Sequence, residues 1–317
     1  MHALTSCSKR HDISYVLRAI SHNNAARRFR VVALDGPCQG AYYAKMKIGS
    51  EQHKELFCRW FIDSNLAYEP TDLAWPDLDE HSLAFLHAVP VWRSALEVEV
   101  NAGGMLDAFA STQRDPLIRE ALALQGYEEA RHGRMLRTLF DRYNIDVTDV
   151  EPSPQSSKGA FVSFGYDECL DSFFGFGIFR IAREAKVVAD SLINVFSRVL
   201  IEEARHIVFF VNWVAYDYAQ RGMRLPVLRI VPSVYGYASA ALRTIRRATT
   251  IDRKDRGMTL AGDVFSGITF TEFLRTALAE NERYMSAFDP RLLRPGLIPA
   301  VARVLLWLPG AQSREAV

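Results

Sequence analysis

The chain has 317 residues, of which 49% are hydrophobic and 24% are charged, a composition typical of a soluble globular protein. Its formal net charge of +1 gives no electrostatic reason to expect a nucleic acid or a membrane surface as a partner. The 4 cysteines form no C-x-x-C pair. This spacing argues against a disulfide framework or a zinc ribbon and favours a cytoplasmic location.

The chain shows no export or membrane signal. Met1 to Asp12 includes Lys9 and Arg10 but lacks the apolar core of a secretory signal peptide. No run of about 18 uncharged apolar residues occurs, so a spanning helix is not expected. The apolar segment 297–309 is short and is interrupted by Arg303. A packed or dimer-forming helix is a better interpretation of it than a helix lying in a membrane interface.

The chain order of elements begins with an irregular region. Residues 1–80 carry one expected helix, over 41–64. From residue 81 onward apolar residues recur at helical spacing with almost no period-two alternation, which predicts an all-α protein. A first long helix is expected over 82–110, with a kink at Pro90. Asp115 and Pro116 read as an N-cap and a first helical residue, so a second helix is expected from there to about Tyr143.

A polar link precedes the remaining helices. Residues 146–158 are long enough to cross a bundle instead of forming a hairpin turn. A third helix is expected over 166–188, and a fourth from Asp190 or Ser191 to about residue 222. Three more are expected over 235–251, 270–288 and 297–308. We therefore expect a single domain, 1–317, with a helical core at about 82–222 and extra helices in 223–317.

The most specific feature of the sequence is a repeated pentapeptide, Glu-Glu-Ala-Arg-His, at 128–132 and 202–206. Residues three apart on a helix share a face. Glu129 with His132, and Glu203 with His206, can therefore each bind one metal ion. The face through Glu203 is otherwise apolar, and a buried charge there is costly unless it is paired or bound to metal. A buried Arg–Glu network without metal is the alternative.

Two more carboxylates are expected at the height of the motifs. In an antiparallel pair, ligands at one height are equidistant from the turn. Glu97 and Glu99 both satisfy this condition opposite Glu129, and Glu99 is favoured because its face is apolar and that of Glu97 is polar. Opposite Glu203 the available residues are Glu168 and Asp171. Glu168 is favoured for its longer reach, with Asp171 as the competitor.

The sequence resembles the ferritin-like di-iron carboxylate superfamily, because the pentapeptide matches the (Asp/Glu)-Glu-x-Arg-His form of its bacterial multicomponent monooxygenases. The resemblance covers about residues 82–222 and implies a ferritin-like four-helix bundle with additional N- and C-terminal helices. It implies that Glu129, His132, Glu203 and His206 are metal ligands, with Glu99 and Glu168 supplied by position. By the same resemblance, Glu128 and Glu202 orient the ligand histidines, and Arg131 and Arg205 neutralise the carboxylate-rich site.

The resemblance also implies a function. Two iron ions, or manganese, would activate O2 to hydroxylate, N-oxygenate or desaturate a small organic substrate, as in the non-heme arylamine N-oxygenases of the superfamily. Those enzymes carry one more histidine where this chain has Val199, which weakens that closest comparison. The extra C-terminal helices favour an enzyme that encloses a substrate. The alternatives are a ferroxidase or a di-manganese catalase, and a metal-free helical scaffold.

Further expectations concern the substrate and the partners. Aromatic side chains near the motifs are candidates for an apolar pocket, although such a stripe is more often core: Phe174, Phe179, Phe210 and Trp213. No Gly-x-Gly-x-x-Gly fingerprint is present, so electrons would come from an external donor. Homodimerisation is expected from the habits of the superfamily, while nucleic acid is not expected and membrane binding is disfavoured.

Overall fold

The computed structural model describes residues 46–152, 157–223, 226–250 and 267–308. Apart from Met46, these residues belong to one unit, Lys47–Val317. Within the described ranges every regular element is a helix, which confirms the predicted all-α class. None of the described helices is long and apolar enough to cross a membrane.

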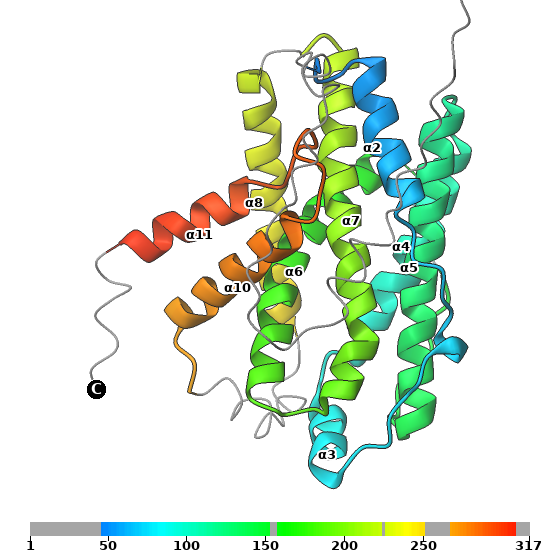
Figure 1. The fold of residues 1–317 in the computed structure, drawn as a ribbon, viewed down its shortest axis with the longest axis vertical. Coiled ribbons are helices and arrows are strands. Elements are labelled where there is room, and N and C mark those ends of the chain that lie inside the picture. The colour runs from blue at the N-terminus through cyan, green and yellow to red at the C-terminus, as the bar shows by residue number, and fades with distance from the viewer. Residues whose placement is uncertain (1–45, 153–156, 224–225, 251–266, 309–317) are drawn as a thin grey trace, which may run out of the picture. The chain divides into compact units, whose positions relative to one another are not determined.

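Four long helices form the centre of this unit (Figure 1). They are α4 (Trp92–Ser111), α5 (Pro116–Tyr143), α6 (Lys158–Glu184) and α7 (Asp190–Gln220). Short turns join α4 to α5 and α6 to α7, and these two hairpins pack together through α4 with α6 and α5 with α7. Asp115 caps α5 as predicted, because its side chain accepts hydrogen bonds from the backbone of Leu117 and Ile118.

The directions of the helices follow from the pairing of α5 with α7. Glu128 pairs with His206, and His132 pairs with Glu202. Residue numbers therefore increase along α5 in the direction in which they decrease along α7. Helices α5 and α7 are therefore antiparallel. Since α6 and α7 form a hairpin, α5 and α6 run in the same direction. The chain between Tyr143 and Lys158 must return along the length of the bundle.

Six further elements of the described ranges surround the bundle. Helix α2 (Glu51–Asp63) packs on α5 and α7, and the 3-10 turn η2 (Pro70–Asp72) packs on α5. Helix α3 (Glu80–Ala88) precedes α4. On the other side, α8 (Pro226–Thr250) and α10 (Phe270–Met285) both pack on α6, and α11 (Leu297–Trp307) packs on α10 and α6.

Several helix boundaries differ from the sequence prediction, among them the start of α8, at Pro226 instead of residue 235, and the end of α6, at Glu184 instead of residue 188. Proline at 90 separates α3 from α4 instead of kinking one helix, since proline lacks the backbone donor that a continuous helix needs. The third helix begins at Lys158, eight residues earlier than expected, because the Ser157 side chain accepts from the backbone of Ala160 as an N-cap. Helix α2 begins at Glu51 after the Ser50 cap, and residues 41–45 lie outside the described ranges.

A polar layer divides the hydrophobic core. On α4, Leu96 and Val100 belong to one buried cluster, and Leu106 belongs to another. On α5, Leu122 and Leu136 are divided in the same way, with residues 128–132 between them. Seven buried polar residues of the two pentapeptides lie in this layer: Glu128, Glu129, Arg131, His132, Glu202, Arg205 and His206.

Two glycines of α6 offer a matched test of this packing. A Cβ atom at Gly165 would stand 2.1 Å from the buried ring of Phe210, whereas a Cβ at Gly175 would have no atom within 4 Å. We predict that Gly165→Ala lowers the free energy of unfolding by about 1–3 kcal/mol through overpacking. Gly175→Ala should raise it by about 0.5–1 kcal/mol through helix propensity. Urea unfolding followed by circular dichroism checks both; equal effects would contradict the described register of α6 against α7.

Candidate metal centre

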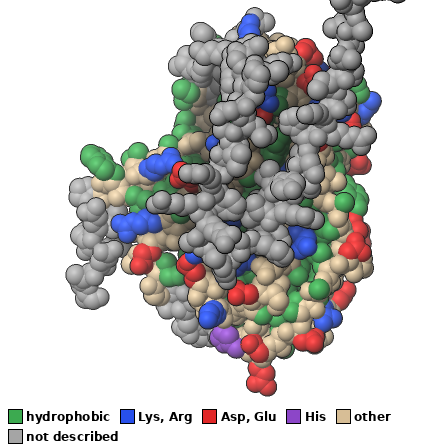
Figure 2. Space-filling model, in the orientation of Figure 1, with side chains coloured by type: hydrophobic (Ala, Val, Ile, Leu, Met, Phe, Trp, Pro, Cys, Tyr) green, Lys and Arg blue, Asp and Glu red, His purple; other side chains and the backbone are tan. Residues whose placement is uncertain are grey.

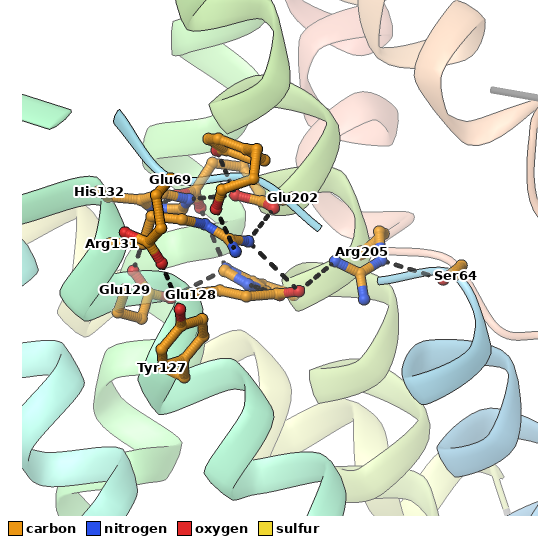
Figure 3. A network of polar contacts seen from close by, with 12 residues as sticks. Ser64, Glu69, Tyr127, Glu128, Glu129, Arg131, His132, Glu202 and Arg205 are labelled. Atoms are coloured by element: carbon orange, nitrogen blue, oxygen red, sulfur yellow. Dashed lines mark hydrogen bonds and ion pairs between the residues drawn. The ribbon is translucent and has the colours of Figure 1, made fainter. Parts of the chain in front are cut away.

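The two pentapeptides face each other where α5 and α7 cross, and each histidine binds the leading glutamate of the other copy. Nε2 of His132 lies 2.9 Å from Oε2 of Glu202, and Nε2 of His206 lies 2.9 Å from Oε2 of Glu128. The other oxygen of each glutamate contacts an arginine of the opposite helix, Arg131 for Glu202 and Arg205 for Glu128. We call these two reciprocal sets the crossed Glu–His–Arg contacts (Figure 3).

Buried arginines hold both leading glutamates. Although burial opposes its ionisation, the charge of Arg205 lowers the pKa of Glu128 to about 2. Both guanidinium groups are almost fully buried. Arg205 donates to Glu128 at 2.7 Å, to the Ser64 side chain at 3.0 Å and to the Phe61 carbonyl at 2.6 Å. An ionised carboxylate only accepts hydrogen bonds. Each histidine must therefore carry a proton on Nε2, which leaves its Nδ1 directed to the opposite side.

The Nδ1 atoms point into a cluster of carboxylates. Nδ1 of His132 lies 3.4 Å from Glu99, 3.5 Å from Glu129 and 3.2 Å from Glu203. Nδ1 of His206 lies 2.9 Å from Glu129 and 3.8 Å from Glu203. These side chains come from α4, α5 and α7 and converge on one place inside the bundle.

The cluster divides into two overlapping groups of ligand atoms. Glu99, Glu129, His132 and Glu203 form one group, and Glu129, Glu168, Glu203 and His206 form the other. Within each group, one ligand atom from every residue lies within 4.8 Å of the others. Glu129 and Glu203 belong to both groups, whereas Glu99 and Glu168 each belong to one. Both motif glutamates are thus placed between two sites, which the pairing of each with its own histidine did not anticipate.

The structure separates the favoured carboxylates from their competitors. Glu99 and Glu168 are brought into the cluster, and neither Glu97 nor Asp171 belongs to either group. Glu97 is exposed on α4. The half-buried Asp171 lies on α6, with its Oδ1 3.5 Å from Oγ1 of Thr244 on α8.

Unpaired buried atoms indicate that the cluster suits metal ions. Four atoms of the cluster are buried without a hydrogen-bond partner: Oε1 of Glu129, Nδ1 of His132, Oε2 of Glu203 and Nδ1 of His206. Distances as short as 2.9 Å separate some of these atoms, yet none of the contacts has hydrogen-bond geometry. A buried polar atom without a partner is costly. Nitrogen and carboxylate oxygen are ligands of iron, manganese and zinc, so the donor set fits such ions.

The electrostatics of the cluster favour a bound cation as well. Burial, with the nearby charge of Glu203, raises the pKa of Glu168 well above its usual range. Burial also raises the pKa of Glu99 to about 8, against the opposing effect of His132. Burial disfavours the ionised form of Glu203 too, but its contacts with Glu168, His132 and His206 hold its pKa well below the usual range. Without an ion, protons would have to hold these carboxylates together.

A segment before η2 contributes contacts that the sequence analysis missed. The Tyr68 hydroxyl donates to Oε2 of Glu202 at 2.9 Å, and the Tyr68 carbonyl accepts from Arg131 at 3.1 Å. On the other side, Ser64 and the Phe61 carbonyl hold Arg205. This region follows no regular pattern, so only the polar character of Ser64 and Tyr68 was visible in the sequence. Tyr68, which contacts Glu202, is half-buried, whereas Ser64, which contacts Arg205, is buried. The two sides of the cluster therefore differ in their exposure to solvent.

The four aromatic candidates for a substrate pocket occupy packed positions. Phe210 and Trp213 are buried and pack edge-on against Phe161, with ring centroids 5.8 and 4.8 Å away. Phe174 stacks on Phe273 of α10 at 5.8 Å, and Phe179 is half-buried against the core. Their part in binding a substrate stays a prediction.

Comparison with known proteins identifies no relative. No family model, no curated protein and no solved structure matches the chain. The chemistry of the cluster is therefore argued from its own residues.

Metal uptake should release protons, because Glu99 and Glu168 must ionise to bind a cation and His132 and His206 must each free Nδ1. Burial lowers the pKa of both histidines, but contacts with Glu129 and the neighbouring carboxylates raise it well above its usual value. We predict that adding Mn²⁺ to metal-free protein at pH 7 releases on the order of four protons per chain. The pKa of Glu99 is raised to about 8 in the folded, metal-free protein. Its protonated carboxyl therefore contributes to stability at low pH, and this contribution is lost as the pH rises through about 8. Apparent affinity for Mn²⁺ should rise over the same window. A pH indicator in weak buffer measures the release, and its absence would contradict the assignment.

The crossed Glu–His–Arg contacts should determine how tightly metal binds. We predict that Glu202→Gln or Glu128→Gln weakens Mn²⁺ binding about 10–100-fold, because each replaces a carboxylate that accepts from both a histidine and an arginine by a neutral amide with one accepting oxygen. Tyr68→Phe removes only one hydrogen bond from Glu202 and should weaken binding less. The exposed Glu97→Gln is the matched control. Titration calorimetry on variants that keep the wild-type circular dichroism spectrum is the measurement, and equal affinity in all four variants would refute the role of these contacts.

Proposed function

We propose that the protein is a non-heme di-iron oxygenase that uses O2 to hydroxylate, N-oxygenate or desaturate a small organic substrate. The observation that carries this proposal is the pair of overlapping ligand groups that share Glu129 and Glu203. The repeated Glu-Glu-Ala-Arg-His motif, which resembles that of di-iron monooxygenases, supports it independently.

Charge balance supports two divalent ions in this position. The cluster offers four carboxylates, from Glu99, Glu129, Glu168 and Glu203, and two histidines. Four ionised carboxylates with neutral histidines match the charge of two divalent cations, so the loaded site would be neutral in a low-dielectric interior. A metal-free Arg–Glu network does not account for the cluster, because Arg131 and Arg205 are engaged by Glu202 and Glu128 on its far side.

Two ferrous ions bound there would supply electrons and open coordination positions for the reductive activation of O2. The protein's own residues would prepare the site in three ways. Glu128 and Glu202 fix the tautomer and orientation of the histidines. The carboxylates of Glu129 and Glu203 lie where each can contact both ions. The hydrophobic clusters above and below the polar layer keep bulk water away.

The source of electrons and the substrate are part of the proposal. Oxygenation by this chemistry needs two electrons for each O2, and we propose an external reductase or a small electron carrier as their source. Helices α8, α10 and α11, which follow the bundle in the sequence, are proposed to shape access for an organic molecule. A ferroxidase or a di-manganese catalase would use the same ligands without an organic substrate, and the experiment has to separate these functions.

The test begins with metal-free protein reconstituted anaerobically with ferrous iron. We predict about two bound irons per chain and a transient visible absorption band after rapid mixing with O2. With a chemical reductant present, O2 consumption should increase on addition of a suitable amine, aromatic or acyl substrate. Glu129→Gln should bind less than the wild-type amount of iron, whereas Glu97→Gln should behave as wild type.

The possible results separate the candidate functions. Consumption of O2 by ferrous iron alone, unchanged by any organic compound or reductant, would indicate a ferroxidase. Two bound manganese ions with rapid disproportionation of peroxide would indicate a catalase. Failure to bind iron or manganese under anaerobic conditions would refute a metal function of the cluster altogether.

A further inference from the structure

The near-zero net charge of the chain conceals a strong separation of charge along the sequence. No Asp or Glu occurs between Asp217 and Asp252, or between Asp289 and Glu315. These two stretches include all of α8 and α11. They carry only basic charges: Arg221, Arg224, Arg229, Arg243, Arg246, Arg247, Arg291, Arg294, Arg303 and Arg314. Because the whole chain has 38 Lys and Arg against 37 Asp and Glu, the rest of the chain is acidic overall.

The same two helices carry most of the large hydrophobic side chains that the described residues expose. On α8 these residues are between 46% and 75% exposed: Leu228, Ile230, Val231, Val234, Tyr235, Leu242 and Ile245. On and just after α11 they are Val301, Val304, Leu305, Trp307 and Leu308, with Trp307 80% exposed. A row of exposed large apolar side chains on a helix is typical of an interaction site.

The exposed faces lie opposite faces that are already packed. On α8 the spacing of Leu228, Val231, Tyr235, Leu242 and Ile245 places them along one side of the helix. The other side packs on α6, where Ala240 is fully buried and the ring of Tyr237 lies 4.8 Å from that of Tyr166. On α11, Pro299 and Ala302 are buried. Both helices are therefore anchored to the bundle by one face, and none of the described segments packs on their second apolar face.

The surface view shows part of this region. In Figure 2 hydrophobic and basic side chains lie at the left edge of the molecule, where Figure 1 places the end of α11. Acidic side chains also occur close to them in the same view.

We infer that the outer faces of α8 and α11 bind the surface of an anionic lipid membrane. A partner for this surface must accept apolar side chains and attract arginines. A bilayer with anionic headgroups does both, because apolar side chains enter the acyl boundary while arginines stay among the headgroups. This inference concerns a different part of the molecule from the metal centre and does not depend on the proposed function.

Charge argues against the other occupants of these faces. Arg221, Arg243 and Arg291 pair within the chain with Asp217, Asp167 and Asp289. The two stretches still contain arginines and no acidic residue, so a second copy docked through the same faces would bring surfaces of like net charge together. The charge of residues 1–45 does not complement these faces either, because they contain seven Lys and Arg (Lys9, Arg10, Arg18, Arg27, Arg28, Arg30 and Lys45) against Asp12 and Asp35. A nucleic acid would satisfy the arginines but would leave the apolar rows in contact with water or phosphate.

The test is flotation of the full-length protein with vesicles. We predict binding to phosphatidylcholine vesicles that contain about 30% phosphatidylserine, and at least about ten-fold weaker binding to phosphatidylcholine alone. Raising the salt concentration should weaken the binding, because screening reduces the attraction to the headgroups. Arg303→Gln should reduce affinity about five-fold, since one basic residue near an anionic surface contributes about 1 kcal/mol.

Variants of the exposed apolar residues give a sharper test. The triple variant Val231→Gln, Tyr235→Gln and Trp307→Gln changes no charge and affects side chains that are 74%, 75% and 80% exposed, so it should fold normally. It should lose at least about ten-fold in affinity for the anionic vesicles. The control is Val91→Gln with Ile178→Gln, which alters exposed apolar residues elsewhere and should bind as wild type.

Two results would overturn the inference. Wild-type protein that does not float with anionic vesicles would refute it directly. So would a concentration-dependent dimer that the triple variant converts to a monomer, since the faces would then bind a second copy. Metal content and circular dichroism of each variant provide the check that the bundle itself is intact.

Discussion

The structure depends on the burial of four carboxylates at one height inside a helical bundle. Glu99, Glu129, Glu168 and Glu203 converge from all four long helices between two hydrophobic clusters. Such a group repels itself unless protons or cations neutralise it. The crossed Glu–His–Arg contacts neutralise their own glutamates only, so the central charge is left for something else. Bound cations would supply this compensation, and without them protons would, because the pKa values of Glu99, Glu168, His132 and His206 are all raised.

Local pattern was sufficient to predict most of the fold and the centre of the site. The Asp115–Pro116 start of α5 and the helical spacing of α5 and α7 are encoded in adjacent residues. The choice of Glu99 over Glu97 needed only the polarity of two helix faces, and the structure places Glu99 in the cluster and Glu97 in solvent. These features are local because helix periodicity converts sequence spacing directly into position on a face.

The features that sequence reasoning missed depend on contacts between distant segments. Tyr68 reaches Glu202 across 134 positions, and Ser64 reaches Arg205 across 141, from a region without periodicity. The sharing of Glu129 and Glu203 between two ligand groups follows from the crossing of α5 and α7, which spacing along one helix does not describe. The net charge is a sum over the chain, and it does not describe the two stretches around α8 and α11 that contain arginines and no acidic residue.

The segment that ends α2 and leads to η2 has a consequence for the symmetry of the centre. The two pentapeptides are related to each other, but residues 61–68 occur once and touch both halves, through Arg205 at one end and through Arg131 and Glu202 at the other. Local unfolding of residues 61–68 would loosen both histidines together. Under the proposed function, the exchange of an ion at one ligand group would thereby be coupled to exchange at the other, through a piece of chain that has no counterpart in the repeat.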